Sequence, residues 1–435
     1  MTNQKSPVGI LGGGITGLSI AYALNKKDID ATVYEKNKTV GGAIQSVHKN
    51  EWLIEEGPNT IQFNKQSEWD LLDELDLNEN LIKANEASKK RFVVRDKQPI
   101  AIPTSLGDFL TSPLLSVKGK LRLLKEPFAA HSVKHDESVA SFIERRLGKE
   151  PLDYGINPFV SGIYAGDPSD LSIKHTFAML WQMEQNHGSL FKGMIKRDRT
   201  PNATKRALIS FTNGNQTLPE AMAKSLNIPV RTATEVTGIK KTDGHWEVTV
   251  KNNGNSTQHY HECLISTLPA HTASAVFKSD LFDELAGLPY APMSVLALGL
   301  KRDQIDHPLD GFGMLIPEVE GYQTLGVLFS STLFARRAPE GHELLTCFIG
   351  GDRNPEAAYK SQKELQQLVL SELDELLGIG GEPVFSHHKC WSRAIPQYKV
   401  GYDHYLSLIK QIEEQHRGLY LDGNYRSGVA VPDCI

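Results

Sequence analysis

The chain has 435 residues, which is longer than one hydrophobic core usually serves, so its length predicts more than one domain. Its 47 lysines and arginines are outnumbered by 52 aspartates and glutamates, and the formal charge of -5 disfavours a nucleic-acid partner. The 4 cysteines form no C-x-x-C pair, so we expect neither a disulfide framework nor a metal site. No signal-peptide pattern and no apolar run of the ~20 residues that span a bilayer is visible, and we expect a cytoplasmic protein.

The most informative motif lies near the start of the chain. An apolar run, Val8–Leu11, predicts a buried parallel strand, and Gly12-Gly13-Gly14-Ile15-Thr16-Gly17 follows it directly. A helix is expected from about residue 15 to 26, so the glycines would form a tight turn whose backbone N–H groups suit a pyrophosphate. Glu35 ends the next predicted strand at the spacing of a carboxylate that binds a ribose, and the adjacent Lys36 is assigned to the same site. This block predicts a Rossmann-like dinucleotide site.

Further motifs narrow the kind of dinucleotide. Gly41-Gly42-Ala43 comes soon after Glu35, which is typical of flavin proteins rather than nicotinamide dehydrogenases. We interpret Gly57-Pro58-Asn59-Thr60 as backbone laid against a flavin ring, with an ordinary Gly-Pro turn as the alternative. Thr267, at the end of a short buried strand, is assigned to the same site. The predicted cofactor is therefore FAD.

The predicted secondary structure changes twice in the middle of the chain. After an amphipathic helix at about 68–77 and a strand hairpin at about 91–102, residues 105–206 show short helical patterns such as 117–129 and 138–147. The end of this region, from Lys192 to Arg206, is basic, which would suit anionic lipid headgroups or substrate carboxylates, or would form a solvated helical face. Strands near 294–300, 324–330 and 344–350 then predict a mostly antiparallel sheet backed by a helix at 363–377.

The predicted fold class is α/β with α+β insertions. We expect a Rossmann-like FAD-binding domain, an inserted substrate domain with a mixed or antiparallel sheet, and an inserted helical lobe that contacts membranes. The expected boundaries are residues 1–67, 207–269 and 404–435 for the FAD-binding domain, 68–104 and 270–403 for the substrate domain, and 105–206 for the helical lobe.

Several longer strings carry a resemblance to a known family. They are Asn157–Pro168, Phe329–Phe334 followed by Arg337-Ala338-Pro339, and Trp391 with Ala394–Tyr398; Gly423-Asn424 and Gly428–Val431 add the end of a cofactor domain. With them the chain resembles the oxygen-dependent protoporphyrinogen oxidases, within the amine-oxidase-like flavoproteins, over nearly its whole length. Relatives continue beyond the position of Ile435 into a helix, which the resemblance predicts to direct its N-terminal dipole at the flavin.

The resemblance implies an activity. It predicts FAD-dependent oxidation of a porphyrinogen, protoporphyrinogen IX or coproporphyrinogen III, to the porphyrin in haem biosynthesis, with O2 reduced to H2O2. Peripheral contact with a membrane surface and a homodimer are further expectations. The alternatives are another flavoenzyme of this superfamily, such as an amine oxidase or a carotenoid-type desaturase, and a flavin-binding protein without turnover.

The resemblance also implies roles for single residues. Val236 would contact the adenine through its backbone, Trp391 would lie beside the flavin, and Val429-Ala430-Val431 would bracket the isoalloxazine end. No paired carboxylate or Ser-His-Asp pattern is evident, so the pyrrole N–H protons could pass to water or to a backbone carbonyl, for which the resemblance implies Gly162. The macrocycle is flat and apolar, so the expected pocket is lined by Phe159, Ile163, Tyr164, Phe312, Met314 and Phe329.

Overall fold

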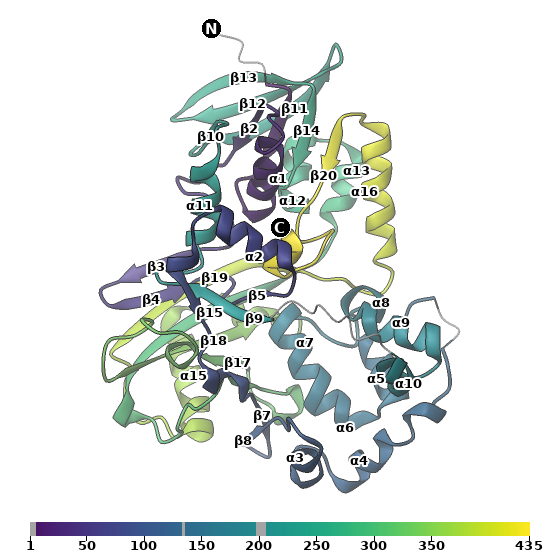
Figure 1. Ribbon diagram of the computed structural model, residues 1–435, viewed down its shortest axis with the longest axis vertical. Helices are drawn as coiled ribbons and strands as arrows, with labels where there is room; N and C mark the ends of the chain where they lie inside the picture. Colours follow the sequence, from purple (N-terminus) through teal and green to yellow (C-terminus); the bar gives the residue numbers. More distant parts are fainter. Residues whose placement is uncertain (1–5, 133–134, 197–205) are drawn as a thin grey trace.

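A five-stranded parallel sheet collects strands from the beginning, middle and end of the chain (Figure 1). The computed structural model describes residues 6–132, 135–196 and 206–435, so residues 197–205 of the basic stretch lie outside the described residues. In spatial order the strands are β10 (Val230–Arg231), β2 (Ala31–Tyr34), β1 (Val8–Leu11), β14 (Cys263–Ser266) and β20 (Leu419–Leu421). Parallel neighbours need long crossover connections, which accommodate the inserted parts of the chain.

Helices and a small antiparallel sheet surround this parallel sheet. α1 begins directly after the glycine turn and ends one residue before its predicted end. The small sheet pairs β11, β12 and β13 in chain order. The bounds are α1 (Ile15–Asn25), α11 (Thr217–Ser225), α12 (Ala270–Phe277), α13 (Asp280–Ala286), α16 (Asp403–Gln415), β11 (Glu235–Thr242), β12 (His245–Asn252) and β13 (Asn255–His261).

Two segments expected in the substrate domain pack with the cofactor domain instead. α2 (Gln66–Glu74) and β6 (Leu81–Lys83) belong to a core that includes Leu18 of α1, and β6 pairs with β9 (Ala207–Phe211) beside β5 (Ile61–Phe63). Likewise, α12 and α13 share a core with β14, β20 and α16. Both differences have one cause: the apolar faces of these short elements are buried against strands and helices of the cofactor domain, which a boundary drawn from composition does not register.

The substrate half is built on a seven-stranded sheet, antiparallel except where β16 runs parallel to β7. One face is covered by α15 (Gln362–Leu377), as predicted, and the two together enclose a buried core. The strands in spatial order are β19 (Phe385–Pro396), β15 (Tyr290–Lys301), β18 (His342–Gly350), β17 (Thr324–Phe329), β16 (Gly313–Leu315), β7 (Phe92–Arg95) and β8 (Gln98–Ala101). A hairpin of β3 (Ser46–Lys49) and β4 (Trp52–Glu55) packs Trp52 against β15 and β18.

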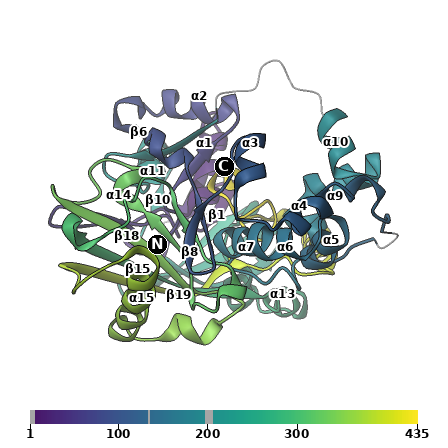
Figure 2. The same cartoon turned by 90° about the horizontal axis from the view of Figure 1, so that it is seen from below.

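The helical lobe projects to one side of both sheets (Figure 2). The helix expected at 117–129 is shorter, because α4 ends at Leu123 and Pro127 follows in a 3-10 turn, η3 (Glu126–Phe128), where its missing N–H is tolerated. No helix among the described residues has both the length and the apolar character to cross a bilayer. The helices of the lobe are α3 (Leu106–Thr111), α4 (Val117–Leu123), α5 (Val139–Arg146), α6 (Lys149–Pro151), α7 (Asn157–Tyr164), α8 (Ile173–Thr176), α9 (Ala178–His187) and α10 (Leu190–Lys196). Two further short elements, α14 (Ser330–Leu333) and η8 (Val431–Cys434), lie outside the lobe.

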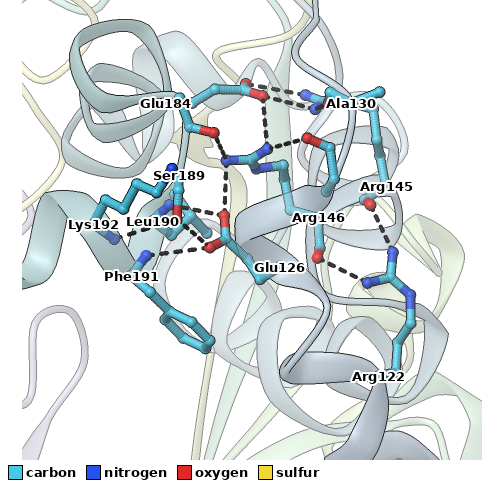
Figure 3. A network of polar contacts seen from close by, with 12 residues as sticks. Arg122, Glu126, Ala130, Arg145, Arg146, Glu184, Ser189, Leu190, Phe191 and Lys192 are labelled. Atoms are coloured by element: carbon cyan, nitrogen blue, oxygen red, sulfur yellow. Dashed lines mark hydrogen bonds and ion pairs between the residues drawn. The ribbon is translucent and has the colours of Figure 1, made fainter.

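A buried network of charges joins the helices of the lobe (Figure 3). Arg146 is fully buried and forms ion pairs of 2.7 Å with Glu126 and 3.6 Å with Glu184. Glu126 also accepts hydrogen bonds from the backbone N–H of Leu190, at 2.8 Å, and from the hydroxyl of Ser189, at 2.6 Å. A carboxylate at this point satisfies N–H groups that a helix start leaves free, so the network fixes the beginning of α10.

Candidate cofactor and substrate site

The glycine turn lies where β1 meets α1, beneath the edge of the parallel sheet. A Cβ on Gly17 would lie 2.0 Å from the carbonyl oxygen of Gly12, so a glycine is required for α1 to pack this closely on the turn. Gly14 is the N-cap of α1 and contributes no capping side chain. The first N–H groups of α1, including those of Ile15 and Thr16, therefore have no helical acceptor and remain free for an anion.

Glu35 orders the glycine turn from the side. The residue is 5% exposed, and its carboxylate accepts hydrogen bonds from the N–H of Gly13, at 2.9 Å, and of Asn37, at 2.8 Å. These two bonds fix the carboxylate while leaving lone pairs for further donors. Lys36, which was also predicted to belong to this site, is exposed. The predicted ribose acid thus lies beside the predicted pyrophosphate turn.

The second glycine loop and the segment at residues 57–60 meet the first turn. The N–H of Gly41 donates to the carbonyl of Gly13 at 2.8 Å. A Cβ on Gly57 would lie 1.9 Å from the carbonyl oxygen of Ala43, so the two segments touch through their backbones. Asn59 turns its amide back to the carbonyl of Gly57, at 2.9 Å, and borders a small cavity shared with Arg337. Segments well separated in sequence therefore converge on one place.

The end of the chain completes this convergence. The hydroxyl of Thr267 donates to the carbonyl of Leu11 at 2.9 Å, at the mouth of the glycine turn. Gly423 and Asn424 follow β20, and the hydroxyl of Tyr398 donates to the carbonyl of Asn424. Beyond them, η8 packs against α1 and β5, as the position of the C-terminus in Figure 1 also shows. Of the three expected flavin contacts there, Val431 is buried, Val429 half-buried and Ala430 exposed.

Val236 and Trp391 approach from opposite sides. Val236 lies on β11, two residues beyond Thr234, whose N–H donates to the carbonyl of Glu35 at 2.8 Å. Trp391 lies on β19, and its indole N–H donates to the carbonyl of Glu56 at 2.7 Å. Val236 therefore lies near Glu35, the predicted ribose acid, and Trp391 lies beside the segment 57–60.

α7 lies over the sheet face opposite α15. Phe159 and Ile163, 38% and 39% exposed, share a face of α7 with Gly162, whereas Tyr164 is buried. A Cβ on Gly162 would lie 2.9 Å from a methyl group of Leu315 on β16, so α7 approaches the sheet closely here. The carbonyl of Gly162 is in the last turn of α7, where carbonyls have no helical donor, and none of the described backbone N–H groups outside the helix donates to it.

Two of the expected pocket residues lie on the wrong face of this sheet. Met314 and Phe329 are 1% and 0% exposed and belong to the core under α15. Strand side chains alternate between faces, so Leu315, which contacts α7, and Met314 point in opposite directions. We therefore leave Met314 and Phe329 out of the pocket. Phe312 is half-buried, and the guanidinium of Arg91 lies 4.8 Å from its ring centroid.

The family model for flavin-containing amine oxidoreductases matches residues 15–435. The chain belongs to this family. It is 36% identical to protoporphyrinogen oxidase 2, chloroplastic/mitochondrial, of Arabidopsis thaliana, over 98% of this chain and 91% of that protein. It is 30% identical to coproporphyrinogen III oxidase of Bacillus subtilis, over 100% of this chain and 97% of that protein. A solved structure from Exiguobacterium sp. 255-15, provisionally assigned as a protoporphyrinogen oxidase, superposes with a TM-score of 0.83 at 25% identity over 100% of this chain and 96% of that one.

Membership of this flavoprotein family confirms the prediction that the cofactor is FAD. The residues present fit it on two structural observations. The free N–H groups at the start of α1 suit a pyrophosphate, and the crossing of Gly13 and Gly41 carries no side chain that would fill the space beside them. Among the described residues, no group of three His, Cys, Asp or Glu side chains is arranged to hold a metal ion.

One cluster beside this site was not anticipated from the sequence. The carboxylate of Glu56 pairs with His387 at 2.7 Å and with Lys389 at 3.0 Å. Burial alone would raise the pKa of Glu56, but the hydrogen bonds and charges of His387 and Lys389 outweigh it and lower that pKa. The alternation of side chains along a strand could have predicted this cluster. Residues 387, 389 and 391 of β19 fall on one face, so His387 and Lys389 lie on the same side of the sheet as Trp391.

Proposed function

We propose that this protein oxidises a porphyrinogen, protoporphyrinogen IX or coproporphyrinogen III, to the corresponding porphyrin in haem biosynthesis. The observation that carries the proposal is the near full-length likeness to proteins named for these two reactions, at 36% and 30% identity. It is supported by an exposed apolar face on α7, formed by Phe159 and Ile163, which suits an apolar ligand.

In this proposal the protein supplies position and surroundings. Phe159 and Ile163 contact the apolar macrocycle, beside the point where Gly162 of α7 meets Leu315 of the sheet. The free carbonyl of Gly162 accepts a hydrogen bond from a pyrrole N–H and orients it, and the proton leaves to water. Bound FAD would supply the two-electron acceptor for each of the three oxidations that lead from porphyrinogen to porphyrin, with O2 as the final oxidant and H2O2 as its product.

A cation near the apolar surface suits the carboxylates of the substrate. Arg91 lies over the ring of Phe312 and is therefore the candidate partner for a propionate group. Coproporphyrinogen III carries four propionates and protoporphyrinogen IX two, so the preferred substrate depends on how many such cations reach the macrocycle.

The test is an aerobic assay with both substrates. The purified, FAD-loaded protein should produce fluorescent porphyrin together with H2O2, and the ratio of the two kcat/KM values identifies the preferred substrate. A loaded protein that oxidises neither substrate, while oxidising an amine or desaturating a carotenoid, would place it elsewhere in the family.

We further propose that the helical lobe contacts an anionic membrane surface. Phe128 is 89% exposed and Ile195 83% exposed, although both are large and apolar, and η3 and α10, which carry them, are in contact. Apolar side chains interleaved with cations are the composition of an interfacial anchor. The neighbouring apolar residues are Val117, Leu121, Leu124 and Met194, and the cations are Lys118, Lys120, Lys125, Lys192 and Lys196. A homodimer stays a prediction, which sedimentation equilibrium would measure.

A further inference from the structure

The ammonium group of Lys389 lies where three segments that converge on the site meet, and a second lysine, Lys49, contacts the neighbouring His387 at 2.9 Å. The ammonium of Lys389 is 3.0 Å from the carboxylate of Glu56, 3.4 Å from the amide oxygen of Gln45 and 4.8 Å from the ring centroid of Trp391. Gln45 in turn donates to the carbonyl of Gly42 at 2.9 Å. Lys389 therefore touches the neighbour of Gly57, the end of the second glycine loop, and the tryptophan expected beside the flavin.

Strand geometry directs Lys389 toward the site rather than away from it. Lys389 and Trp391 are two residues apart on β19, so their side chains share a face. Their partners on β15, Val295 and Met293, both belong to the apolar cluster that contains Trp391. The side chain of Lys389 is 33% exposed, which means that most of it is covered by these neighbours.

The charge in this cluster is divided in a specific way. Glu56 keeps its negative charge, since the pKa of its carboxyl is lowered, and its side chain is only 10% exposed. His387 holds the other carboxylate oxygen at 2.7 Å. Lys389 and Glu56 are thus opposite charges 3.0 Å apart beside the segment 57–60, and removing one exposes the field of the other.

We propose that Lys389 is a flavin-tuning residue whose positive charge favours the reduced, negatively charged cofactor, and that Glu56 opposes it. The inference rests on bound FAD and on the proposed placement of its contacts at Gly42, Gly57 and Trp391. It does not depend on which substrate the enzyme oxidises. Lys389 acts as a cation near the ring system and takes no part in breaking a substrate bond.

The experiment measures the midpoint potential of the bound FAD in the purified holoenzyme by equilibration with a reference dye. Lys389→Met should lower the potential by about 30 mV, a tenfold change in the reduction equilibrium of a two-electron couple. Glu56→Gln should raise it by a similar amount. Sulfite, which adds to electron-poor flavins, should bind about tenfold more weakly to the first variant and more tightly to the second.

Opposite signs are the decisive result, because loss of packing alone would move both variants in the same direction. Lys389→Arg, which keeps the charge, should retain the wild-type potential. Lys90→Met is the matched control, since Lys90 also pairs with a carboxylate, that of Asp310 at 2.7 Å, and lies 4.8 Å from a ring centroid, that of Phe92.

Equal potentials in wild type and Lys389→Met, or shifts of one sign in both charge variants, would overturn the inference. If Lys389→Met does not retain FAD, Glu56→Gln and Lys389→Arg decide the matter alone. A protein that shows these shifts but oxidises no porphyrinogen would contradict the proposed function and leave this inference standing.

Discussion

Glu35 shows how one side chain can serve both the fold and the ligand. Its two oxygens accept hydrogen bonds from the N–H groups of Gly13 and Asn37, and so fix the turn that joins β1 to α1. The same carboxylate is the proposed partner of the ribose. Removing it would leave two backbone donors at the site without their acceptor.

We expect Glu35→Ala to weaken FAD binding by at least about tenfold, since a hydrogen bond to a charged group contributes about 1.5–3 kcal/mol. The measurement is the dissociation constant of FAD from titration of the apoprotein. Lys38→Ala is the control, because Lys38 is nearby but exposed and is not among the predicted site residues. A Glu35→Ala variant that keeps its full complement of FAD through gel filtration would show that the ribose assignment is wrong.

At the same scale, the sequence could predict which apolar residues are candidates for the pocket, but not which of their side chains face it. Phe159 and Ile163 lie on the open face of α7, whereas Met314 and Phe329 are buried under α15. A sheet covered on both faces by other elements is apolar on both, so alternation of polar and apolar residues no longer marks the side that faces a ligand.

Among the elements, α10 depends most clearly on a partner distant in sequence. Its start is held by Glu126, which is itself held by Arg146 of α5 (Figure 3). Arg146→Met leaves two buried carboxylates without their shared cation. We expect a loss of about 3–5 kcal/mol in the free energy of unfolding, measured by denaturant titration.

Lys149→Met is the control for that variant. Lys149 pairs with Asp153, but its side chain is 62% exposed, and the loss should stay below about 1 kcal/mol. Equal losses in the two variants would mean that burial adds nothing to the network, contrary to the explanation given for α10.

The same network predicts a dependence of stability on pH. Burial alone would raise the pKa of Glu184, but the hydrogen bonds from Arg145 and the charges of Arg145 and Arg146 outweigh this effect, and the net pKa is lowered. A lowered folded-state pKa stabilises the fold above the unfolded-state value, and the stabilisation disappears as the pH falls through the folded-state value. We expect Glu184→Gln to flatten the acid side of the stability curve, measured by thermal unfolding across pH. An unchanged acid limb would contradict this role.

At the scale of the whole molecule, the helical lobe exposes large apolar side chains, Phe128 and Ile195, on its surface. We predict that the protein co-sediments with vesicles containing an anionic lipid and that high salt weakens this binding. Phe128→Ser combined with Ile195→Ser should weaken it further, because apolar area would no longer enter the interface. Val384→Ser is the control, as Val384 is 51% exposed on the substrate half. Binding that is unaffected by the double substitution would contradict a contact through η3 and α10.

The local motifs of this protein were determined by its sequence. The strand–glycine–helix unit at residues 8–25, the acid at Glu35 and the antiparallel strands with α15 depend on hydrophobic period, glycine placement and capping, which act between near neighbours. These were sufficient to predict a flavin site and the class of fold.

Only the tertiary structure decided which distant segments meet. It placed α2, β6, α12 and α13 with the cofactor domain. It also placed the side chains of Leu315 and Met314 on opposite faces of one strand, β16. It also brought Lys389 and Glu56 together, although 332 positions separate them along the chain. Contacts of this kind depend on how apolar faces and charges are shared among elements that fold against one another, and no local pattern encodes that choice.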